Sequence, residues 1–482
     1  MRSISRRDFL HDSAILAALA GAGLGSESSA AEKAVAKKGQ LNDQLRVAVI
    51  GVHGRGRDHI SGLAGKHDCI ITTICDADSA VIAPAMKAVE KKQGKAPNYE
   101  QDIRKVVEDK NIDIVTIATP NHWHALAAIW AMQNGKDVYV EKPVSHNVSE
   151  GRRIVEVARK TNRICQTGTQ SRSSTGLKEA MAFLHAGKLG KIKVARALCY
   201  KPRGSIGKVS GPQPTPQTCD YDLWCGPAPK VPLMRKRLHY DWHWVWDTGN
   251  GDLGNQGIHE MDKARWGLNK PQLANSVVSV GGRFGYVDDG QTANTQICLF
   301  DYGDCELIFE VRGLLTNGLL GAKVGNIWYG TDGYMVCGSY RKAVAFTLKG
   351  DVIQEFAGDE SHYANFIKAV RSRKVEDLNA DILEGHLSSA LCHLGNISYR
   401  LGDEQPFGQT PQAFAKDKDA GETFERMEQH LKDNKITLDG VKCRIGRKLA
   451  VEPSKEIFLG DKEANTLLTR EYRKGFEVPA KV

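Results

Sequence analysis

The chain has 482 residues, 41% hydrophobic and 26% charged, which excludes a disordered, a collagen-like and a disulfide-scaffold protein and suffices for two hydrophobic cores. Its 66 Lys and Arg residues outnumber its 57 Asp and Glu residues, but the net charge of +9 is spread along the sequence. With no arginine-rich run, zinc-finger spacing or aromatic RNA-binding signature, the sequence predicts no nucleic-acid partner.

The N-terminus carries a predicted export signal. Residues 5–10 read Ser-Arg-Arg-Asp-Phe-Leu, a twin-arginine signature, and small residues at 28–31 suit a signal peptidase. The apolar run between them, 14–24, is too short to span a membrane, which takes ~20 residues, and no later run reaches that length. We predict that residues 1–31 direct export to the periplasm by the twin-arginine route, that 32–43 form a linker, and that the chain has no membrane span. An ordinary amphipathic N-terminal helix is the alternative.

Residues 44–168 alternate short apolar runs with helical patterns. The β-rich runs lie at 45–50, 69–75, 113–118, 137–140 and 163–167. Almost wholly apolar strands separated by helices are typical of a parallel sheet that helices cover on both faces. We therefore predict an α/β domain with a parallel sheet over residues 44–168.

A glycine-rich turn after the first strand predicts a dinucleotide site. Residues 51–56 read Gly-Val-His-Gly-Arg-Gly, and glycines there let the backbone approach a pyrophosphate at the following helix N-terminus. Asp76 closes the second strand, where a carboxylate accepts the ribose hydroxyls and repels a 2′-phosphate, so we predict NAD rather than NADP. Asp78 is the weaker candidate for this role. The cofactor residues predicted from this part are Gly51, His53, Gly54, Arg55, Gly56 and Asp76.

A second segment with site chemistry ends the third strand. Residues 119–124 read Thr-Pro-Asn-His-Trp-His, and Asn121 is expected either to cap a helix or to contact the cofactor, since ligands bind at this edge of such sheets. His122 and His124 would face different sides of a helix, so the pair predicts no metal site. We assign Thr119, Pro120, Asn121 and His124 to the cofactor site.

The fourth strand ends in Glu141-Lys142-Pro143. A lysine here is either a solvated surface residue or, because the proline favours extended geometry before it, an ammonium directed into the crevice. In the second case Lys142 hydrogen-bonds a substrate hydroxyl beside the nicotinamide. We assign Glu141 and Lys142 to the cofactor site and Lys142 to catalysis.

After residue 168 the pattern changes. Runs such as 305–311 alternate as antiparallel strands do, and helical patterns cover 361–371 and 382–401. We predict an α+β domain over 169–440 and a basic, irregular tail over 441–482. The eleven cysteines are widely spaced without a Cys-x-x-Cys motif, and we expect most of them to be small buried hydrophobic residues.

Aromatic residues alternate with other residues between positions 240 and 246. Period 2 places Tyr240, Trp242, Trp244 and Trp246 on one face of a predicted strand. That face is either part of the core or a surface on which a sugar ring stacks. His239 and His243 lack acidic or cysteine ligands at matching spacing, so we predict no metal.

A glycine-rich run, 249–257, leads into a predicted helix with His259. Asn255, His259 and Asp262 fall on one face of that helix, and His259 is a candidate general base for a hydroxyl proton. A histidine merely hydrogen-bonded within a packed helix is the alternative. We assign His259 to catalysis and Arg172, Trp246, Asn255 and Asp262 to the substrate site.

Together these segments resemble the glucose–fructose oxidoreductase/inositol dehydrogenase (Gfo/Idh/MocA) family over nearly the whole chain after the signal. The likeness rests on the glycine turn, Glu141-Lys142-Pro143, the run into His259, residues 221–227 (Tyr-Asp-Leu-Trp-Cys-Gly-Pro) and the Asn365-Phe366 helix. The resemblance implies a Rossmann domain, a second domain with a large open, mostly antiparallel sheet, and catalytic roles for Lys142 and His259. It also implies a homo-oligomer, a dimer or tetramer, often formed through that sheet.

The family's dehydrogenases usually carry Asp where this chain has Asn255, and an amide cannot stabilise a charged imidazole as a carboxylate does. We expect His259 to titrate lower, or Glu260 or Asp262 to compensate. Our main hypothesis is an NAD(H)-dependent oxidoreductase acting on a secondary hydroxyl of a sugar, glycoside or cyclitol. Because free NAD is scarce outside the cytoplasm, we expect a tightly held cofactor. The alternatives are an NAD-dependent glycosidase of the kind this family contains and a non-catalytic sugar-binding protein.

Overall fold

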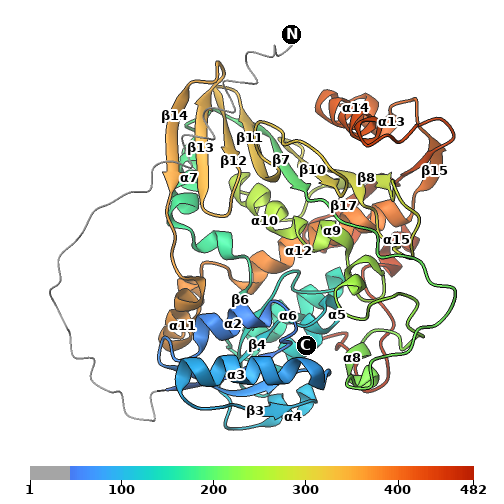
Figure 1. The fold of residues 1–482 in the computed structure, drawn as a ribbon. Coiled ribbons are helices and arrows are strands. Elements are labelled where there is room, and N and C mark those ends of the chain that lie inside the picture. The colour runs from blue at the N-terminus through green and yellow to red at the C-terminus, as the bar shows by residue number, and fades with distance from the viewer. Residues whose placement is uncertain (1–43) are drawn as a thin grey trace.

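The computed structural model describes residues 44–482, which form two layered domains (Figure 1). The predicted export signal and linker therefore lie outside the described residues. The first domain is built on a six-stranded sheet in the order β3-β2-β1-β4-β5-β6, and every neighbouring pair is parallel. The strands are β1 (Leu45–Ile50), β2 (Cys69–Cys75), β3 (Asn98–Glu100), β4 (Ile114–Ile117), β5 (Asp137–Val140) and β6 (Cys165–Thr167).

Helices cover both faces of this sheet, which confirms the predicted Rossmann architecture. Alternate residues of β1 point to opposite cores: Val47 and Val49 pack on one side and Ala48 and Ile50 on the other. Burial on both faces explains why these strands read as continuous apolar runs. The helices are α2 (Gly56–Leu63), η2 (Ser79–Val81), α3 (Ile82–Gln93), α4 (Ile103–Glu108), α5 (Asn121–Gln133) and α6 (Val148–Lys160).

The second domain carries a twelve-stranded, mostly antiparallel sheet, as the family resemblance implies. Its main path is β14-β13-β12-β11-β7-β10-β9-β8-β16-β15, and only β7 and β10 pair in parallel. The strands are β7 (Ile192–Tyr200), β8 (Ser276–Gly282), β9 (Thr295–Asp301), β10 (Glu306–Arg312), β11 (Val324–Gly330), β12 (Gly333–Cys337), β13 (Lys342–Thr347), β14 (Val352–Ala357), β15 (Asp403–Pro406), β16 (Lys442–Ile445), β17 (Leu449–Glu452) and β18 (Ile457–Phe458).

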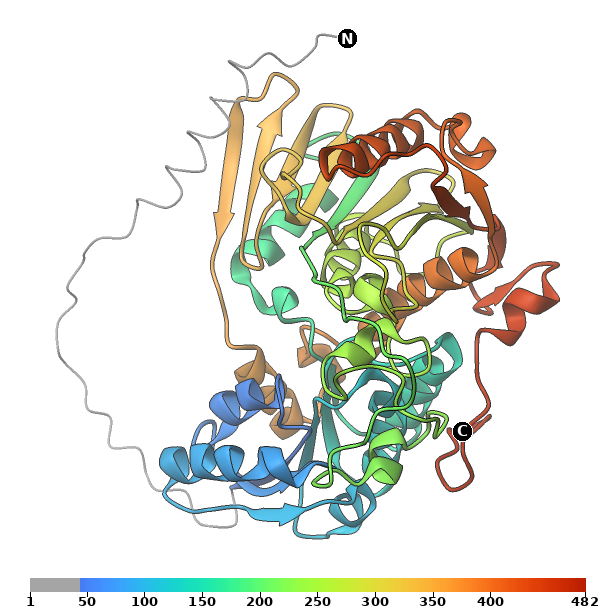
Figure 2. The same cartoon turned by 45° about the vertical axis from the view of Figure 1, so that its right-hand side comes forward.

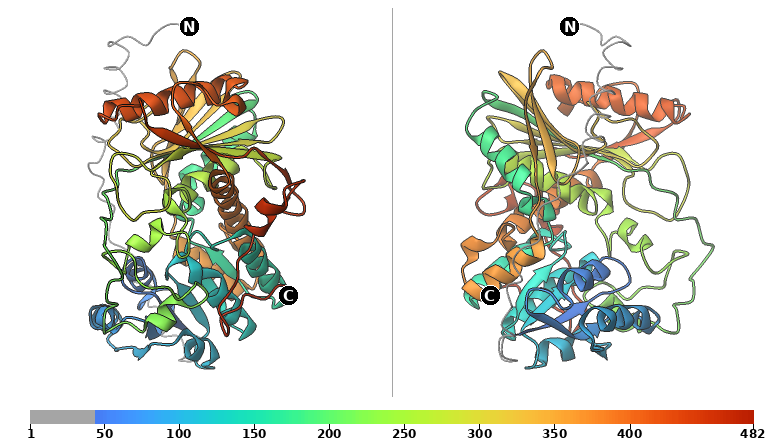
Figure 3. Two further views of the ribbon diagram at one scale, coloured as in Figure 1. Left: turned by 90° about the vertical axis from the view of Figure 1, so that its right-hand side faces the viewer. Right: turned by 60° about the vertical axis from the view of Figure 1, so that its left-hand side comes forward.

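Helices between the two sheets join the domains. Helices α10 and α12 pack on the inner face of the large sheet, and α12 also packs against α6 of the first domain (Figures 1 and 3). Helix α14 covers the opposite face near β8 and β9. The helical segments are η3 (Gln170–Ser173), α7 (Thr175–His185), α8 (Tyr221–Cys225), η4 (Asp241–Trp244), α9 (Gly251–Gly254), α10 (Gly257–Gly267), α11 (His362–Ser372), η5 (Val375–Asp377), α12 (Ile382–Arg400), α13 (Gln412–Ala415), α14 (Lys418–Asp433) and α15 (Lys462–Thr466).

Three local predictions are wrong. The helix that carries His259 begins at Gly257, so Asn255 lies before it and not on one helix face with His259 and Asp262. Residues 240–246 form no strand: Asp241–Trp244 is a short 3-10 helix, so the four aromatic side chains do not share one face. Residues 441–482 are not an irregular tail, since β16 and β17 extend the large sheet. The chain then returns to the first domain, where Phe476 packs against Trp123 with ring centroids 5.6 Å apart (Figure 2).

All eleven cysteines are buried with free thiols, in agreement with their predicted role as small hydrophobic residues. None of the helices within residues 44–482 is long and apolar enough to cross a membrane.

Candidate active site

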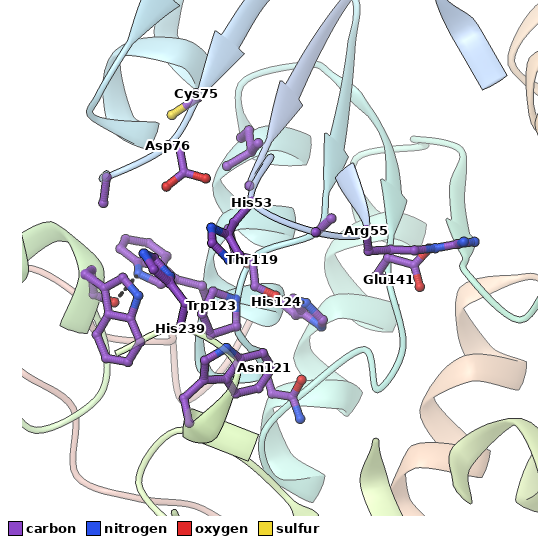
Figure 4. A pocket seen from close by; sticks show the side chains of 18 of the residues that line it. His53, Arg55, Cys75, Asp76, Thr119, Asn121, Trp123, His124, Glu141 and His239 are labelled. Atoms are coloured by element: carbon purple, nitrogen blue, oxygen red, sulfur yellow. Dashed lines mark hydrogen bonds and ion pairs between the residues drawn. The ribbon is translucent and has the colours of Figure 1, made fainter. Parts of the chain in front are cut away.

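A crevice lies where strands β1, β2, β4 and β5 end. It is lined by every residue predicted to contact the cofactor except Gly56, and Figure 4 shows Asp76 at one end and the Arg55–Glu141 pair at the other. The crevice occupies about 310 Å³. Its position at the carboxyl edge of a parallel sheet is where ligands bind in this fold class.

The glycine turn fits a pyrophosphate. Gly51 has φ +84°, and a Cβ atom there would lie 2.7 Å from the backbone of Ala118. A Cβ atom on Gly56 would lie 1.9 Å from the Gly51 oxygen, so both positions require glycine. At Gly54 no atom lies within 4 Å of such a Cβ position, which leaves open space over the N-terminus of α2 for an anion.

Asp76 lies at the end of β2 beside this turn. Its Oδ2 accepts the Val52 amide at 2.9 Å and its Oδ1 accepts the Asp78 amide at 3.0 Å, which fixes the carboxylate at the rim. Burial raises the pKa of Asp76. The Asp78 carboxylate instead contacts the His239 ring, with 2.8 Å between Oδ2 and Nε2. The geometry therefore favours Asp76 as the ribose acceptor.

A segment of the second domain crosses the crevice. The Thr218 oxygen accepts the Ser79 amide and the Ala77 oxygen accepts the Asp220 amide, both at 2.9 Å. The His239 ring stacks on His53 with centroids 4.3 Å apart (Figure 4). We call residues 218–243 the cover segment; among its residues, those that line the crevice are Leu223, Trp224, His239, Tyr240, Trp242 and His243.

Sequence reasoning missed the cover segment as part of the cofactor site. Residues 221–227 carry only a family likeness in the sequence, and the alternation at 240–246 predicts a strand. Its single sequence signal is the density of aromatic and histidine residues in a stretch otherwise rich in glycine and proline.

Glu141 is held in place by neighbouring cations. Its Oε1 accepts hydrogen bonds from Arg55 Nε at 2.9 Å and Gln170 at 3.2 Å, and it lies 3.2 Å from His59 Nε2. Burial opposes ionisation, but the charge of Arg55 and the contact with His59 hold the pKa of Glu141 well below its usual range. Oε2 is buried without a partner. This carboxylate therefore anchors the turn that carries Lys142.

Lys142 lies where two cavities meet. It lines the cofactor crevice and also a larger, open cleft of about 1270 Å³, and its Nζ donates to the main-chain oxygen of Asn255 at 2.9 Å. Burial lowers the pKa of its ammonium group. Lys142 is thus not a solvated surface lysine, and its position fits a group that contacts both cofactor and substrate.

His259 faces the same cleft. Its side chain is buried, its Nδ1 has no hydrogen-bond partner, and its ring lies edge-on to Tyr340 with centroids 5.1 Å apart. Burial and the charge of Lys142 hold the pKa of His259 well below its ordinary value. The imidazole is therefore neutral near pH 7 and able to accept a proton.

Neither Glu260 nor Asp262 compensates for the amide at position 255, because both carboxylates bind other groups. Glu260 contacts Gln256 and Lys263, and Asp262 pairs with Arg172 at 2.8 Å. Asn255 itself donates to Asp252 at 3.4 Å. The lowered pKa of His259 agrees with the expectation that it titrates lower.

The other predicted substrate residues are placed apart from this cleft. Arg172 and Asp262 are buried in a network with Glu384 and Ser388, a geometry that favours a structural role. Trp246 lines a third pocket, which shares no residue with the crevice or the cleft.

The two histidines of the third segment bind backbone oxygens. His122 contacts the Trp224 oxygen at 2.9 Å, and His124 joins the oxygens of Thr119 and Pro143 at 2.8 and 2.6 Å. His124 thereby ties the end of β4 to the turn after β5. Within residues 44–482 no group of three or more His, Cys, Asp or Glu side chains could hold a metal ion.

Comparisons with known proteins agree with this geometry. Residues 45–169 match the oxidoreductase family, NAD-binding Rossmann fold of Gfo/Idh/MocA, and residues 191–432 match the C-terminal α/β domain of the same family. A glycosyl hydrolase family 109 protein of Shewanella sp. (strain W3-18-1) is 34% identical over 34% of this chain and 39% of its own length. An α-N-acetylgalactosaminidase of Shewanella oneidensis is 31% identical over the same shares. The chain thus matches about two fifths of the length of these curated relatives.

Solved structures share the fold. The WlbA dehydrogenase of Bordetella pertussis, crystallised with NADH and UDP-GlcNAcA, has a TM-score of 0.52 at 20% identity and covers 73% of this chain and 96% of its own. An oxidoreductase of Thermotoga maritima has a TM-score of 0.56 at 17% identity and covers 73% and 97%. At these identities the likeness is one of fold.

Proposed function

This chain belongs to the Gfo/Idh/MocA family of NAD-binding oxidoreductases, and on that basis we propose that it oxidises or reduces a secondary hydroxyl carbon of a sugar, glycoside or cyclitol. The observation that carries the proposal is the position of Lys142 and His259. Both line the large cleft, and Lys142 alone of the two also lines the cofactor crevice. A substrate hydroxyl held by Lys142 would therefore reach the cofactor crevice from the cleft.

NAD, when bound, supplies the oxidation or reduction of the carbinol carbon. Protein residues perform the other steps. Asp76 and the glycine turn would bind the dinucleotide, and Lys142 orients the hydroxyl through its ammonium group. His259, neutral because of burial and the nearby Lys142 charge, takes the hydroxyl proton. Among residues 44–482 its Nδ1 has no hydrogen-bond partner.

We further propose that the cofactor is held tightly and that the protein is exported and forms a homo-oligomer. The cover segment supports tight binding, since backbone hydrogen bonds at Ser79 and Asp220 and the His53–His239 stack would have to open for NAD to leave. A held cofactor suits an enzyme that works where free NAD is scarce. Export itself rests on the twin-arginine signature at residues 5–10.

Glycoside hydrolysis is the second candidate, and the family 109 relatives favour it. In this scheme transient oxidation at C3 acidifies the C2 proton, a base removes it, and the aglycone leaves with a proton by elimination. Water then adds across the C1–C2 double bond, with OH at C1 and H at C2, and reduction at C3 restores the sugar. His259 would again accept the proton. The net reaction consumes no NAD, which agrees with a closed cofactor site.

One experiment separates these candidates. Protein purified without added nucleotide is denatured, and the released dinucleotide is identified and counted per chain. The native protein is then given aryl glycosides and cyclitols, and both the released aglycone and the keto product are measured. Bound NAD(H) with keto-sugar formation supports the oxidoreductase, whereas aglycone release without net NADH supports the glycosidase. An absence of both products with every glycoside and cyclitol tested would contradict both and favour a sugar-binding protein.

A further inference from the structure

A third pocket of about 330 Å³ lies beside α12 and the C-terminal segment, on the far side of Asn250 from the cofactor crevice. It shares no residue with the two cavities described above. Its volume falls within the range of small-molecule sites. The residues that define it here are His146, Trp246, Asp247, Asn250, Asn396, Arg400 and Arg470.

The lining combines an aromatic platform with planar polar groups. Trp246 is half-buried, and Arg400 lies over its ring with the guanidinium carbon 5.2 Å from the centroid. The Trp246 amide is fixed by Gln291 at 2.8 Å, so the indole is carried on an ordered backbone. Among residues 44–482 no hydrogen-bond acceptor or carboxylate within ion-pair distance engages the Arg400 guanidinium, although the charge of Asp247 acts on it, so its N–H groups can donate to a ligand.

Buried polar groups complete the pocket. Asn250 and Asn396 are each 5% exposed and are joined by a 2.9 Å hydrogen bond. The His146 ring is held within the protein: its Nδ1 accepts from Arg470 at 3.1 Å, and the ring also bonds the main chain of Trp246. These contacts fix the polar lining beside the indole.

The charges that line the pocket indicate a neutral ligand. Two arginines, Arg400 and Arg470, face two carboxylates, Asp247 and Glu471, so the formal charge is balanced. His146 and His393 remain neutral, because burial lowers the pKa of both rings. A balanced set of donors and acceptors around an indole favours a neutral polyhydroxylated ring over an anion.

We propose that this pocket is a second carbohydrate-binding site, which takes one neutral pyranose unit against Trp246. It does not take part in the reaction, and it holds sugar without needing Lys142, His259 or NAD. The site also borders the catalytic region: Asn121 of the crevice donates to Asn250 at 3.0 Å, and Asn250 donates in turn to the His146 oxygen at 3.1 Å. The sugar predicted to stack on Trp246 is thus placed outside the active cleft.

The test follows Trp246 directly. The full chain, containing eight tryptophans, is labelled with 5-fluorotryptophan, and the Trp246 fluorine resonance is assigned by its loss in Trp246→Phe. Titration with neutral methyl pyranosides is expected to shift this resonance in a saturable way, and inorganic phosphate is expected to leave it unmoved. The shift should persist in Lys142→Ala. In Arg400→Ala the apparent Kd should rise about threefold to tenfold, as for loss of one or two hydrogen bonds.

Three results would overturn the proposal. These are no shift with any pyranoside at tens of millimolar, a saturable shift with phosphate but not pyranosides, and a pyranoside shift that disappears in Lys142→Ala. The last would show that Trp246 reports sugar bound in the catalytic cleft. Unchanged positions of the other seven resonances in Trp246→Phe and Arg400→Ala show that these variants are folded.

Discussion

The Nζ atom of Lys142 donates a 2.9 Å hydrogen bond to the main-chain oxygen of Asn255, and so joins the turn after β5 to the start of the helix that carries His259. The acceptor is the main-chain oxygen of Asn255 and not its side chain, so this hydrogen bond is independent of the Asn255 side-chain amide that stands where the family usually has Asp. It leaves two of the three ammonium protons for a substrate and directs the positive charge toward His259. The two catalytic candidates are therefore coupled both in position and in charge.

Lys142→Ala is expected to lower turnover by at least about a thousandfold while bound NAD stays near its wild-type amount. The charge that orients the hydroxyl is lost, but Asp76, the glycine turn and the cover segment remain. Dinucleotide content after denaturation and kcat on the best glycoside measure the two effects. Lys87→Ala, on the exposed face of α3, is the matched control. Turnover within about tenfold of wild type would remove Lys142 from the mechanism.

His259→Gln is expected to reduce kcat by about a hundredfold to ten-thousandfold, the usual range for loss of a general base. Glutamine keeps the volume and hydrogen-bonding capacity, but it cannot take up a proton. Because Tyr340 packs edge-on against the ring, thermal unfolding must be compared as well. A variant that keeps both its melting temperature and its turnover would assign His259 a packing role only.

Asp76→Ser is expected to weaken NAD binding by about tenfold to a hundredfold and to improve relative binding of NADP. The substitution removes the carboxylate proposed to accept the ribose hydroxyls, together with its repulsion of a 2′-phosphate. Equilibrium titration of nucleotide-free protein with both dinucleotides gives the ratio directly. If Asp78→Ser changed this ratio and Asp76→Ser did not, the ribose assignment would belong to Asp78.

His239→Ala is expected to speed NAD release about threefold to tenfold. The substitution removes the stack on His53 and the pair with Asp78, whose side chain is 4% exposed. The dissociation rate, followed by trapping released NAD with a second enzyme, is the measurement. His185→Ala, at the exposed C-terminal end of α7, is the control. An unchanged rate would mean that the cover segment opens elsewhere or does not limit release.

Much of the Rossmann domain could be predicted because its signals are local. Strand β1, the glycine turn and Asp76 follow one another within a single βαβ unit, and each residue type is dictated by backbone geometry or by its ligand. The turn residues after β4 and β5 could be placed for the same reason. Their chemistry lies at the edge where parallel strands end.

The second domain resisted prediction where contacts are distant in sequence. Alternation at 240–246 predicted a strand, but tight packing among residues 240–249 formed a 3-10 helix and a turn that direct Trp242 and Trp246 to different pockets. The partner of Arg172 is 90 residues away, so its ion pair with Asp262 could not be read from spacing. Long-range pairing of this kind leaves no periodic signal.

The amide at position 255 provides a test of the base through pH. Because the pKa of His259 is lowered, its neutral form persists below pH 6.5, and the acidic limb of kcat/KM is expected to lie below that value. In Asn255→Asp, the introduced carboxylate stabilises the protonated imidazole, raises its pKa, and should shift the limb upward by up to about one pH unit. The Lys142 bond to the main-chain oxygen is retained, so kcat at pH 8 should change little.

The outcome distinguishes two arrangements of the same residues. Asp252 is already paired with Arg203, and the Asn255 amide donates to it, so the introduced carboxylate is repelled from Asp252. If the introduced carboxylate turns toward His259, the acidic limb of kcat/KM moves to higher pH. The uncharged variant Asn255→Leu then leaves the pH of this limb unchanged. If the acidic limb of kcat/KM shifts by the same pH interval in both variants, the Asn255 amide acts through packing and not through charge. An acidic limb that moves in neither variant would show that position 255 does not affect the proton transfer. Burial and the surrounding charges, that of Lys142 first among them, would then set the pKa of His259.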